Sequence, residues 1–317
     1  MKKLFRLSLL LLVSSSTFSQ SNYKNEIGFT SDNDSYLAIR QDRYYTNGLF
    51  ISFRHAVNQV NYSKKTEKKI WELEAGQYMF NPLTGYIKNP ASIDRPFAGY
   101  SFLTGKQTWF FRDEQVLRVS AQIGILGPSA KGKEAQEILH NTFGFYEITG
   151  WQYQIKDEAG VNLGLNYSNP VLRNTSGNTD LSYTGYVNIG NTFTNAGTGV
   201  IFRTGKINKL FNSVSTNSRI SNKTIKDSVP ARELFFFAKP MLNFIAYDAT
   251  IQGGLFRADK GPVTYTPNRF VLTQELGVMY AKKRWTLNFA VIFKSKEISS
   301  MRLSQQYGSA NIYYRFN

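Results

Sequence analysis

The chain has no cysteine among its 317 residues. This absence excludes a disulfide scaffold, a thiolate metal site and a cysteine nucleophile. Beyond the first twenty residues there is also no long uninterrupted apolar run, so a helical membrane protein is excluded. The mean hydropathy of −0.33 resembles that of a soluble protein. A transmembrane β-barrel can have the same value, because only every second residue of its strands faces lipid.

The N-terminal segment, residues 1–20, has the pattern of a secretory signal peptide. Three basic residues precede or flank the start of the short apolar stretch Leu7–Val13, and small polar residues follow it. The apolar stretch is too short to span a bilayer, which argues against the alternative of a signal anchor. We therefore predict cleavage near Ser19 or Gln20, a barrel domain over residues 21–317, and export in a bacterium with two membranes.

The charge balance is strongly basic, with 38 Lys and Arg against 22 Asp and Glu. Removing the signal peptide takes away three basic residues, so the mature chain has 35 against 22 and a net charge of +13. Such a surface usually binds nucleic acid. For an exported barrel, however, the polyanion at hand is lipopolysaccharide, whose lipid A part carries phosphates. We therefore predict this partner and no nucleic acid.

Apolar and polar residues alternate with period two in many segments, as in β-strands with two different faces. In residues 116–125 and 285–294, apolar side chains take every second position, and polar ones such as Arg118 and Lys294 lie between them. A soluble sandwich would show the same alternation. The strands are as long as a tilted membrane span requires, and the charged second face suits a hydrated lumen, so we favour a barrel.

Aromatic residues support the barrel prediction. The final segment, Asn311–Phe316, alternates and has an aromatic residue almost at its end, which resembles the C-terminal signal of the outer-membrane assembly machinery. Aromatic pairs at predicted strand ends, such as Tyr44–Tyr45 and Tyr313–Tyr314, suggest interfacial girdles.

We predict an all-β fold, a twelve-stranded antiparallel transmembrane β-barrel, present as a monomer in the bacterial outer membrane. The predicted strands are residues 25–32, 44–57, 70–80, 97–111, 115–126, 155–168, 180–193, 197–205, 233–247, 269–281, 284–297 and 307–316. An even number of strands places both termini in the periplasm, so the first connection, 33–43, is extracellular. The connection 206–232 falls on the periplasmic side, is long for that side, and can hold short helices.

One extracellular connection breaks the β pattern. Lys133–Phe143 contains good helix formers, with Gly127–Pro128 before it and Gly144 after it. Gln136 and His140 lie four residues apart and therefore share one face of the predicted helix. A helix in such a loop can pack down over the barrel mouth.

The chain has two histidines. His55 follows outward-facing positions near the periplasmic end of its strand, so we interpret it as an interfacial side chain. His140 lies on the predicted helix and is the candidate for catalysis. Alternation places Asp34 and Thr46 on inward-facing positions at the extracellular rim, although the polar residues around Asp34 are also common in ordinary turns.

Several motifs in order resemble the lipid A 3′-O-deacylase (LpxR-type) family. They are Ser31-Asp-Asn-Asp34 with Asp42-Arg-Tyr-Tyr-Thr-Asn-Gly48, Asp94-Arg-Pro-Phe-Ala-Gly99, Gly127-Pro-Ser-Ala-Lys-Gly-Lys-Glu-Ala-Gln136, and His140 followed by Gly150-Trp-Gln-Tyr-Gln154. The resemblance covers about residues 26–158, whereas the C-terminal half matches only as alternating strands.

The resemblance implies a twelve-stranded outer-membrane barrel and a calcium-dependent esterase that removes the 3′-linked acyloxyacyl group of lipid A. It implies that His140 is the general base. The other implied catalytic residues are Asn33, Asp34, Thr46 and Gln136. A basic pair of the family is only half present here, as Lys88.

For substrate phosphates we name Lys88 and Arg95 as candidates, and for the metal Asp34 and Glu147. The family has an acidic residue shortly after the helix. An ungapped alignment places Tyr146 at that position, and Glu147 follows directly. Calcium prefers oxygen ligands, which carboxylate, amide and backbone groups supply.

Ester hydrolysis in this chain requires a nucleophile other than cysteine. No Gly-x-Ser-x-Gly motif occurs, so we predict that water attacks and that a neutral histidine deprotonates it near pH 7. The active site would lie at the extracellular leaflet. Two alternatives are an outer-membrane phospholipase with a serine nucleophile, for which Ser52 is the inward-facing candidate, and a non-catalytic barrel that acts as a pore or binds a surface.

Overall fold

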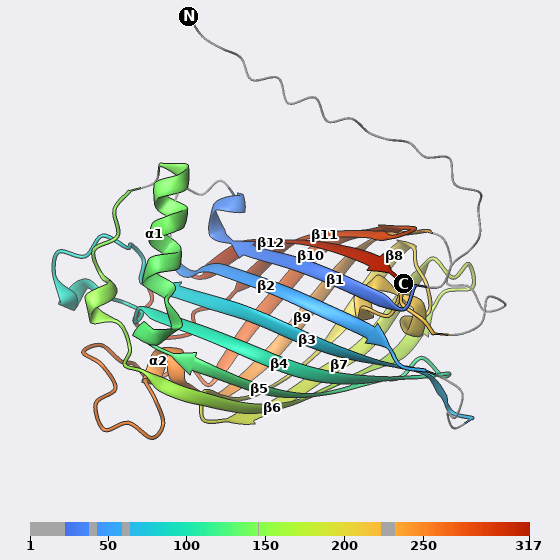
Figure 1. Cartoon of the computed structure of the whole chain (residues 1–317), viewed down its shortest axis with the longest axis horizontal. Helices are drawn as coiled ribbons and strands as arrows, with labels where there is room; N and C mark the ends of the chain where they lie inside the picture. Colours follow the sequence, from blue (N-terminus) through green and yellow to red (C-terminus); the bar gives the residue numbers. More distant parts are fainter. Residues whose placement is uncertain (1–22, 38–42, 59–63, 145, 223–231) are drawn as a thin grey trace, which may run out of the picture.

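Twelve antiparallel strands close into a barrel in which each strand pairs with its sequence neighbours and β1 pairs with β12 (Figure 1). The structure is a computed structural model that describes residues 23–37, 43–58, 64–144, 146–222 and 232–317. The predicted all-β, twelve-stranded antiparallel barrel is confirmed. The predicted signal peptide, residues 1–20, lies outside the described residues.

The strands agree closely with the predicted segments. Their bounds are β1 Asn25–Asn33, β2 Tyr44–Ala56, β3 Thr66–Asn81, β4 Ala98–Phe111, β5 Val116–Leu126, β6 Glu158–Arg173, β7 Thr179–Gly190, β8 Phe193–Lys206, β9 Arg232–Asp248, β10 Phe270–Lys282, β11 Trp285–Lys294 and β12 Gln305–Phe316. The largest differences are at the starts of β3 and β8, each four residues earlier than predicted, and at the end of β6, five residues later than predicted.

The two ends of the barrel differ in their connections. β1 begins opposite the end of β12, with Asn25 paired to Phe316, so the described chain starts and finishes at one end, here called the terminal end. The opposite end, here called the loop end, carries most of the long connections and the helix α1, Gly132–Phe143 (Figure 1). No helix in the described part of the chain is long and apolar enough to cross a membrane.

The two faces of the barrel wall have opposite polarity, as the alternation predicts. Outward side chains such as Phe29 and Ile51 are about half exposed. Inside, Arg54 donates to Glu26 at 2.8 Å and to Glu72 at 2.7 Å, and all three side chains are buried. The outer face therefore suits lipid, and the inner face satisfies its charges by ion pairs.

Aromatic side chains form a belt on the outer face near the terminal end. Phe53 lies 5.3 Å from Trp71 and 6.4 Å from Phe316, measured between ring centroids. His55 lies 5.8 Å from Trp71 and its Nδ1 is 2.8 Å from Asn25 Oδ1, as expected for an interfacial side chain. The predicted girdle at Tyr44–Tyr45 is wrong, because both residues are buried under the loop end.

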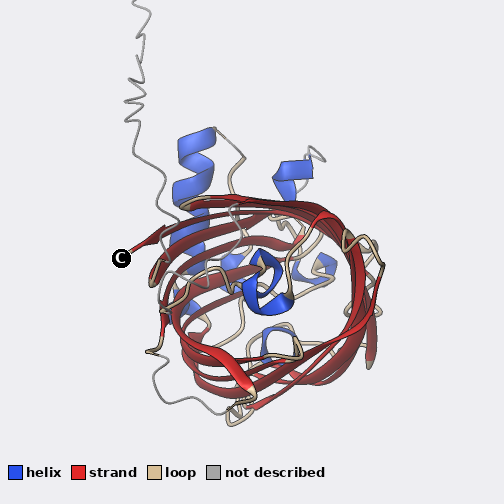
Figure 2. Cartoon of the chain, turned by 90° about the vertical axis from the view of Figure 1, so that its right-hand side faces the viewer, coloured by secondary structure: helices blue, strands red, loops and turns tan. Residues whose placement is uncertain are grey.

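A segment between β8 and β9 folds back into the barrel at the terminal end (Figure 2). It contains two predicted short helices, η5 Leu210–Asn212 and η6 Val214–Thr216. Lys68 Nζ donates to the carbonyl of Ser218 at 2.6 Å. Glu233 accepts from Ser213 Oγ at 2.6 Å. This segment, residues 207–222, is called the plug.

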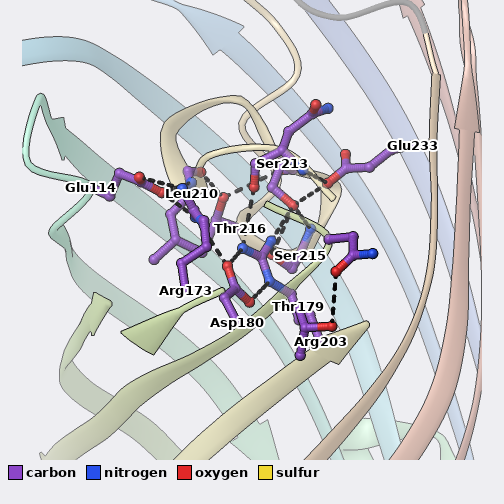
Figure 3. A network of polar contacts seen from close by, with 12 residues as sticks. Glu114, Arg173, Thr179, Asp180, Arg203, Leu210, Ser213, Ser215, Thr216 and Glu233 are labelled. Atoms are coloured by element: carbon purple, nitrogen blue, oxygen red, sulfur yellow. Dashed lines mark hydrogen bonds and ion pairs between the residues drawn. The ribbon is translucent and has the colours of Figure 1, made fainter. Parts of the chain in front are cut away.

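Buried ion pairs tie the plug to the wall (Figure 3). Arg203 Nε donates to Asp180 at 2.9 Å, and its Nη1 donates to Ser213 at 2.8 Å. Arg173 joins Asp180 to Glu114, which in turn accepts from the backbone N–H of Leu210. The plug is thus held by charged groups on the inner faces of the barrel strands and the turns that connect them.

Loops cover the mouth of the barrel at the loop end. A buried cluster joins Tyr44 on β2, Ile251 on the short helix α2 (Ala249–Gln252), and Ile298 and Met301 between β11 and β12. Between this cover and the plug lies a polar cavity of about 580 Å³. The expectation that the predicted helix covers the mouth is not met, because α1 stands outside the ring of strands (Figure 2).

Candidate active site

The helix α1 buries two polar side chains against the barrel wall. Gly132, Gln136 and His140 follow one another at four-residue spacing and are all buried. α1 contacts β3 and β4. Its exposed side holds polar residues such as Lys133 and Glu134 together with Ile138, which is 66% exposed. This placement fits a helix that presses Gln136 and His140 against the outer wall of a barrel.

Close backbone contact fixes the beginning of α1 on the wall. A Cβ atom added to Gly99 on β4 would lie 3.2 Å from Gly132 Cα, so two glycines allow the approach. Ser101 Oγ donates to the carbonyl of Ala130 at 2.8 Å. Trp151 Nε1 donates to Gln136 Oε1 at 2.8 Å, and both side chains are buried. The predicted role of Gln136 beside His140 therefore includes holding the helix.

The imidazole of His140 has a defined hydrogen-bond partner. Its Nδ1 is 2.7 Å from the backbone carbonyl oxygen of Tyr146. A carbonyl oxygen only accepts, so Nδ1 carries the proton and Nε2 is the basic nitrogen of the neutral ring. The Tyr146 ring also meets the imidazole edge-on at 5.3 Å. The connection after α1 thus orients the imidazole.

A row of paired residues crosses the outer wall beside α1. Asn33 on β1 pairs with Asn47 on β2, which pairs with Met79 on β3. They share the outer faces of their strands with lipid-facing residues such as Phe29 and Ile51. We call Asn33, Asn47 and Met79 the outer strip.

Two helices flank the outer strip. At one side the row continues to Gly99, which α1 covers. At the other it continues to Gly308 on β12, which lies beneath Tyr36 of the helix η1, Asp34–Leu37. The distance between Gly99 and Gly308 is roughly 19 Å, because four strand spacings separate them.

The structure brings Asn33 and Asp34 to this strip but not to the inner face. Asn33 lies on the outer face, where its Oδ1 accepts from the backbone N–H of Ser35 at 2.7 Å. Asp34 is 3% exposed and accepts from the backbone N–H of Arg43 at 2.8 Å. The predicted inward direction of Asp34 rested on strand alternation, which ends at Asn33 because η1 begins there.

Thr46 is the extra residue of a β-bulge. Tyr45 pairs with Phe80 and Asn47 with Met79, so Thr46 has no opposing residue on β3. Its hydroxyl donates to the carbonyl of Met79 at 3.4 Å. Tyr45 takes the inner face instead and donates to Asp32 at 2.8 Å. The alternation that predicted an inward Thr46 is therefore interrupted at this position, and Thr46 lies at the same rim as Asp34.

Asn47 was not among the predicted site residues. Its side chain is 5% exposed, and its Oδ1 has no hydrogen-bond partner among the described residues. The residue stands between Thr46 and Gly48 in a motif that the sequence already singled out. A short polar residue in that motif was therefore visible, but its burial was not.

The two predicted phosphate contacts have different surroundings. Lys88 is exposed, with its Nζ 5.6 Å from the ring centre of Tyr86. Arg95 is fully buried and donates to Glu297 at 3.3 Å and to Thr250 at 3.1 Å. The structure thus contradicts a phosphate contact by Arg95, because its guanidinium holds the loop-end cover together.

The pKa of Glu297, which lies beside Arg95, is strongly lowered. Burial by itself would raise the pKa of Glu297, but Lys294 and Arg95 outweigh this and lower the pKa to about 2. Lys294 Nζ lies 2.5 Å from Glu297 Oε1. The carboxylate therefore stays ionised at the centre of a basic pair.

The predicted metal ligands do not form a carboxylate cage. Glu147 is exposed on the connection after α1, whereas Asp34 is buried. In the described ranges, no group of three or more histidine, aspartate or glutamate side chains could hold a metal ion. The donors beside Asp34 on the strip are amide and hydroxyl oxygens, which suit a hard cation such as calcium. The orphaned Oδ1 of Asn47 adds one more oxygen of this type.

The serine alternative is disfavoured by position. Ser52 is on the inner face, where a Cβ atom on Gly28 would lie 2.7 Å from Ser52 Oγ and 2.2 Å from the Tyr313 ring. His140 belongs to α1 outside the wall. The barrel wall thus separates the two side chains, so His140 is not placed to activate Ser52.

Comparison with known proteins gives one full-length match at the family level. The family model described as "Outer membrane protein LpxR" matches residues 4–316. The structure of LpxR from Salmonella typhimurium has a TM-score of 0.73 at 18% identity, and the match covers 92% of this chain and 100% of that one. No curated protein sequence matches the chain.

Other solved structures match the chain with lower scores. The β domain of the Bordetella autotransporter BrkA has a TM-score of 0.48 at 10% identity, covering 93% of this chain and 100% of that one. The translocator domain of NalP from Neisseria meningitidis has a TM-score of 0.41 at 11% identity, covering 93% and 89%.

Proposed function

Because the chain belongs to the LpxR family of outer-membrane proteins, we propose that it is a lipid A deacylase. Its reaction would be calcium-dependent hydrolysis of the ester that links the 3′ acyloxyacyl group of lipid A. The substrate is lipopolysaccharide in the extracellular leaflet, and the enzyme acts as a monomer. The proposal makes the loop end the extracellular end and the terminal end the periplasmic one.

The observation that carries this proposal is the burial of Gln136 and His140 of α1 against the outside of the barrel wall. The outer face of that wall otherwise carries exposed apolar side chains that suit lipid. A base at that position meets molecules that lie in the membrane rather than in the lumen. An ester between a sugar and an acyl chain lies at the same depth, between headgroup and hydrocarbon.

His140 acts as the general base in this proposal. The bond from Nδ1 to the Tyr146 carbonyl leaves Nε2 as the proton acceptor. A water molecule loses its proton to Nε2 as its oxygen attacks the ester carbonyl carbon. The resulting imidazolium returns that proton to the sugar oxygen as the carbon–oxygen bond breaks. The products are a 3′-hydroxyl group and a free fatty acid, so atoms and charge balance.

The outer strip and the neighbouring bulge bind the reacting ester. Asn33 supplies an amide group that can donate to the carbonyl oxygen as it gains charge, and Thr46 can do the same when its hydroxyl turns away from the Met79 carbonyl. Gln136 is a positioning residue, because it acts through Trp151 to hold α1 and hence His140.

Asp34 is the principal side chain for holding calcium in the proposal, with backbone carbonyls and amide oxygens around it. A calcium ion held there would supply Lewis-acid polarisation of the ester carbonyl. Glu147 is the second candidate ligand. Its exposure means that it joins such a site only from the outside.

Lys88 remains the candidate for a lipid A phosphate. It is exposed on the connection between β3 and β4, next to Tyr86, and carries a charge that suits a phosphate. The basic mature chain favours the same anionic surface.

The deciding experiment is mass spectrometry of lipid A from cells that express the chain. We expect loss of the mass of the 3′ acyloxyacyl group when calcium is present, and retention of that mass in the presence of a chelator. Unchanged lipid A from cells in which the barrel is folded in the outer membrane would refute the proposal. Labelling of the protein by a serine-reactive phosphonate would instead favour the phospholipase alternative.

A further inference from the structure

Burial of the Asn47 side chain has a free-energy cost that no contact within the described part of the fold offsets. Its side chain is 95% removed from solvent in a position between two paired strands, and its Oδ1 has no partner among the described residues. A buried acceptor without a donor costs about 1–3 kcal/mol. Groups of this kind occur where a ligand supplies the missing interaction.

The surroundings of Asn47 indicate what that ligand is. Asn33 lies directly opposite, so the two Cα atoms are about 4.5–5.5 Å apart. Asp34 follows Asn33, and Thr46 precedes Asn47. These side chains present carboxylate, amide and hydroxyl oxygens. A group of oxygen acceptors attracts a hard cation, which takes ligands at about 2.3–2.6 Å.

The scarcity of carboxylates makes neutral oxygens necessary. The described residues contain no group of three or more acidic or histidine side chains that could hold a metal. Asp34 is the buried acid at the strip. Calcium takes six to eight oxygens, and backbone and asparagine carbonyls are among its usual ligands. A site built around one buried carboxylate therefore requires amide oxygens.

We infer that Asn47 donates its Oδ1 to a calcium site shared with the Asp34 carboxylate. The inference rests on the proposed function only for the identity of the cation and its use in catalysis. Asn47 is then a functional side chain whose buried oxygen is satisfied when calcium is bound. Asn33 pairs with Asn47 across β1 and β2, but its Oδ1 already accepts from the backbone N–H of Ser35.

The experiment measures cation binding by the folded barrel in detergent. Terbium luminescence, excited through nearby tyrosines, reports the affinity, and calcium competes for the site. Calcium-induced change in melting temperature is the second readout. The variants are Asn47→Ala and Asn47→Asp. Asn188→Ala is the control, because Asn188 is bonded to Asn195 on the inner face.

We expect Asn47→Ala to weaken terbium and calcium binding by about tenfold or more, because it removes one ligand. Without calcium its melting temperature equals or exceeds that of the wild type, since the orphaned oxygen is gone. With calcium it gains less stability than the wild type. Asn47→Asp retains binding, and Asn188→Ala binds as the wild type does.

Two results would overturn the inference. The first is wild-type affinity in Asn47→Ala, which would mean that water or a donor group of the substrate satisfies the oxygen. The second is no cation binding by the wild type up to about 10 mM calcium, roughly tenfold above the weak end of known protein sites at about 1 mM. Because binding is measured without turnover, lipid A that stays intact while Asn47-dependent binding is present refutes the proposed function alone.

Discussion

At the scale of single residues, the position of one proton has the most direct consequence. The Tyr146 carbonyl accepts from Nδ1 of His140, so Nε2 is the basic nitrogen whenever the ring is neutral. The partner is a backbone group, so no substitution of the Tyr146 side chain removes it. This bond links the end of α1 to the chemistry.

Replacing His140 by alanine removes the proposed base while it leaves the strands untouched. We expect deacylation to fall by about 100- to 10,000-fold. The barrel should still fold, which heat-modifiable mobility in gels checks. His55→Ala is the matched control, because His55 belongs to the aromatic belt at the terminal end. Equal activity of His140→Ala and the wild type would rule out His140 as the general base.

Glu297 makes the stability of the loop end depend on pH. Its pKa in the folded protein is about 2, below the ordinary 4.5, because Lys294 and Arg95 outweigh the effect of burial. A carboxylate whose pKa is lowered by folding contributes its full stabilisation at pH values above its pKa in the unfolded chain. That stabilisation is lost as the pH falls from about 4.5 through about 2.

We therefore predict that the wild-type melting temperature declines between pH 4.5 and pH 2. Glu297→Gln should melt lower than the wild type at neutral pH and show less of this decline. Glu137→Gln, on the exposed side of α1, is the control, because its pair with Lys133 contributes little. Identical pH profiles of Glu297→Gln and the wild type would contradict the assignment.

At the scale of elements, the contact between α1 and the wall determines where His140 lies. A Cβ atom on Gly132 would come 2.8 Å from the Trp151 ring and 3.1 Å from Gly99 Cα. Neither neighbour can move without displacing the helix or the strand. The contact is therefore sensitive to a single methyl group.

Gly132→Ala should shift α1 outward and lower deacylation by about 10- to 100-fold, because small misplacement of a catalytic group is costly. Strand content by circular dichroism should not change. Gly105→Ala is the control, since nothing lies within 4 Å of a Cβ atom there. Full activity of Gly132→Ala would show that the close approach is unimportant.

Strand alternation was sufficient to predict the strands and their order, because lipid and lumen impose opposite demands on successive residues. It failed where the chain departs from regular geometry. The bulge at Thr46 breaks the alternation, and the turn into η1 ends it at Asp34. Neither irregularity follows from residue type alone. Hence the alternation identified residues of this rim but could not assign the faces of Thr46 and Asp34.

Tertiary contacts explain the remaining differences. Arg95 has the residue type of a phosphate contact, but its partner Glu297 lies 202 positions away. Asn47 was passed over because a motif does not reveal which of its polar groups is buried. The outside position of α1 was equally hidden, since helix periodicity shows a polar face without showing what covers it.

At the scale of the whole molecule, the barrel is closed at both ends. The plug fills the terminal end and the loops cover the other, leaving a polar cavity of about 580 Å³ between them. We predict little ion conductance for the wild type in planar bilayers.

Replacement of residues 208–221 by a short flexible linker should raise the conductance, because it removes the plug and its contacts with Arg203 and Glu233. Folding of the variant is checked by heat-modifiable mobility. A wild-type protein that conducts as an open pore would contradict a closed lumen.

The location of α1 outside the ring of strands has a kinetic consequence. A lipid that reaches the outer strip arrives by sliding sideways within its own leaflet and never leaves the membrane. Encounter is then two-dimensional. Turnover in such a geometry follows the fraction of the surface that the lipid occupies, and diluting the same lipid with an inert detergent slows the reaction even when its bulk concentration is unchanged.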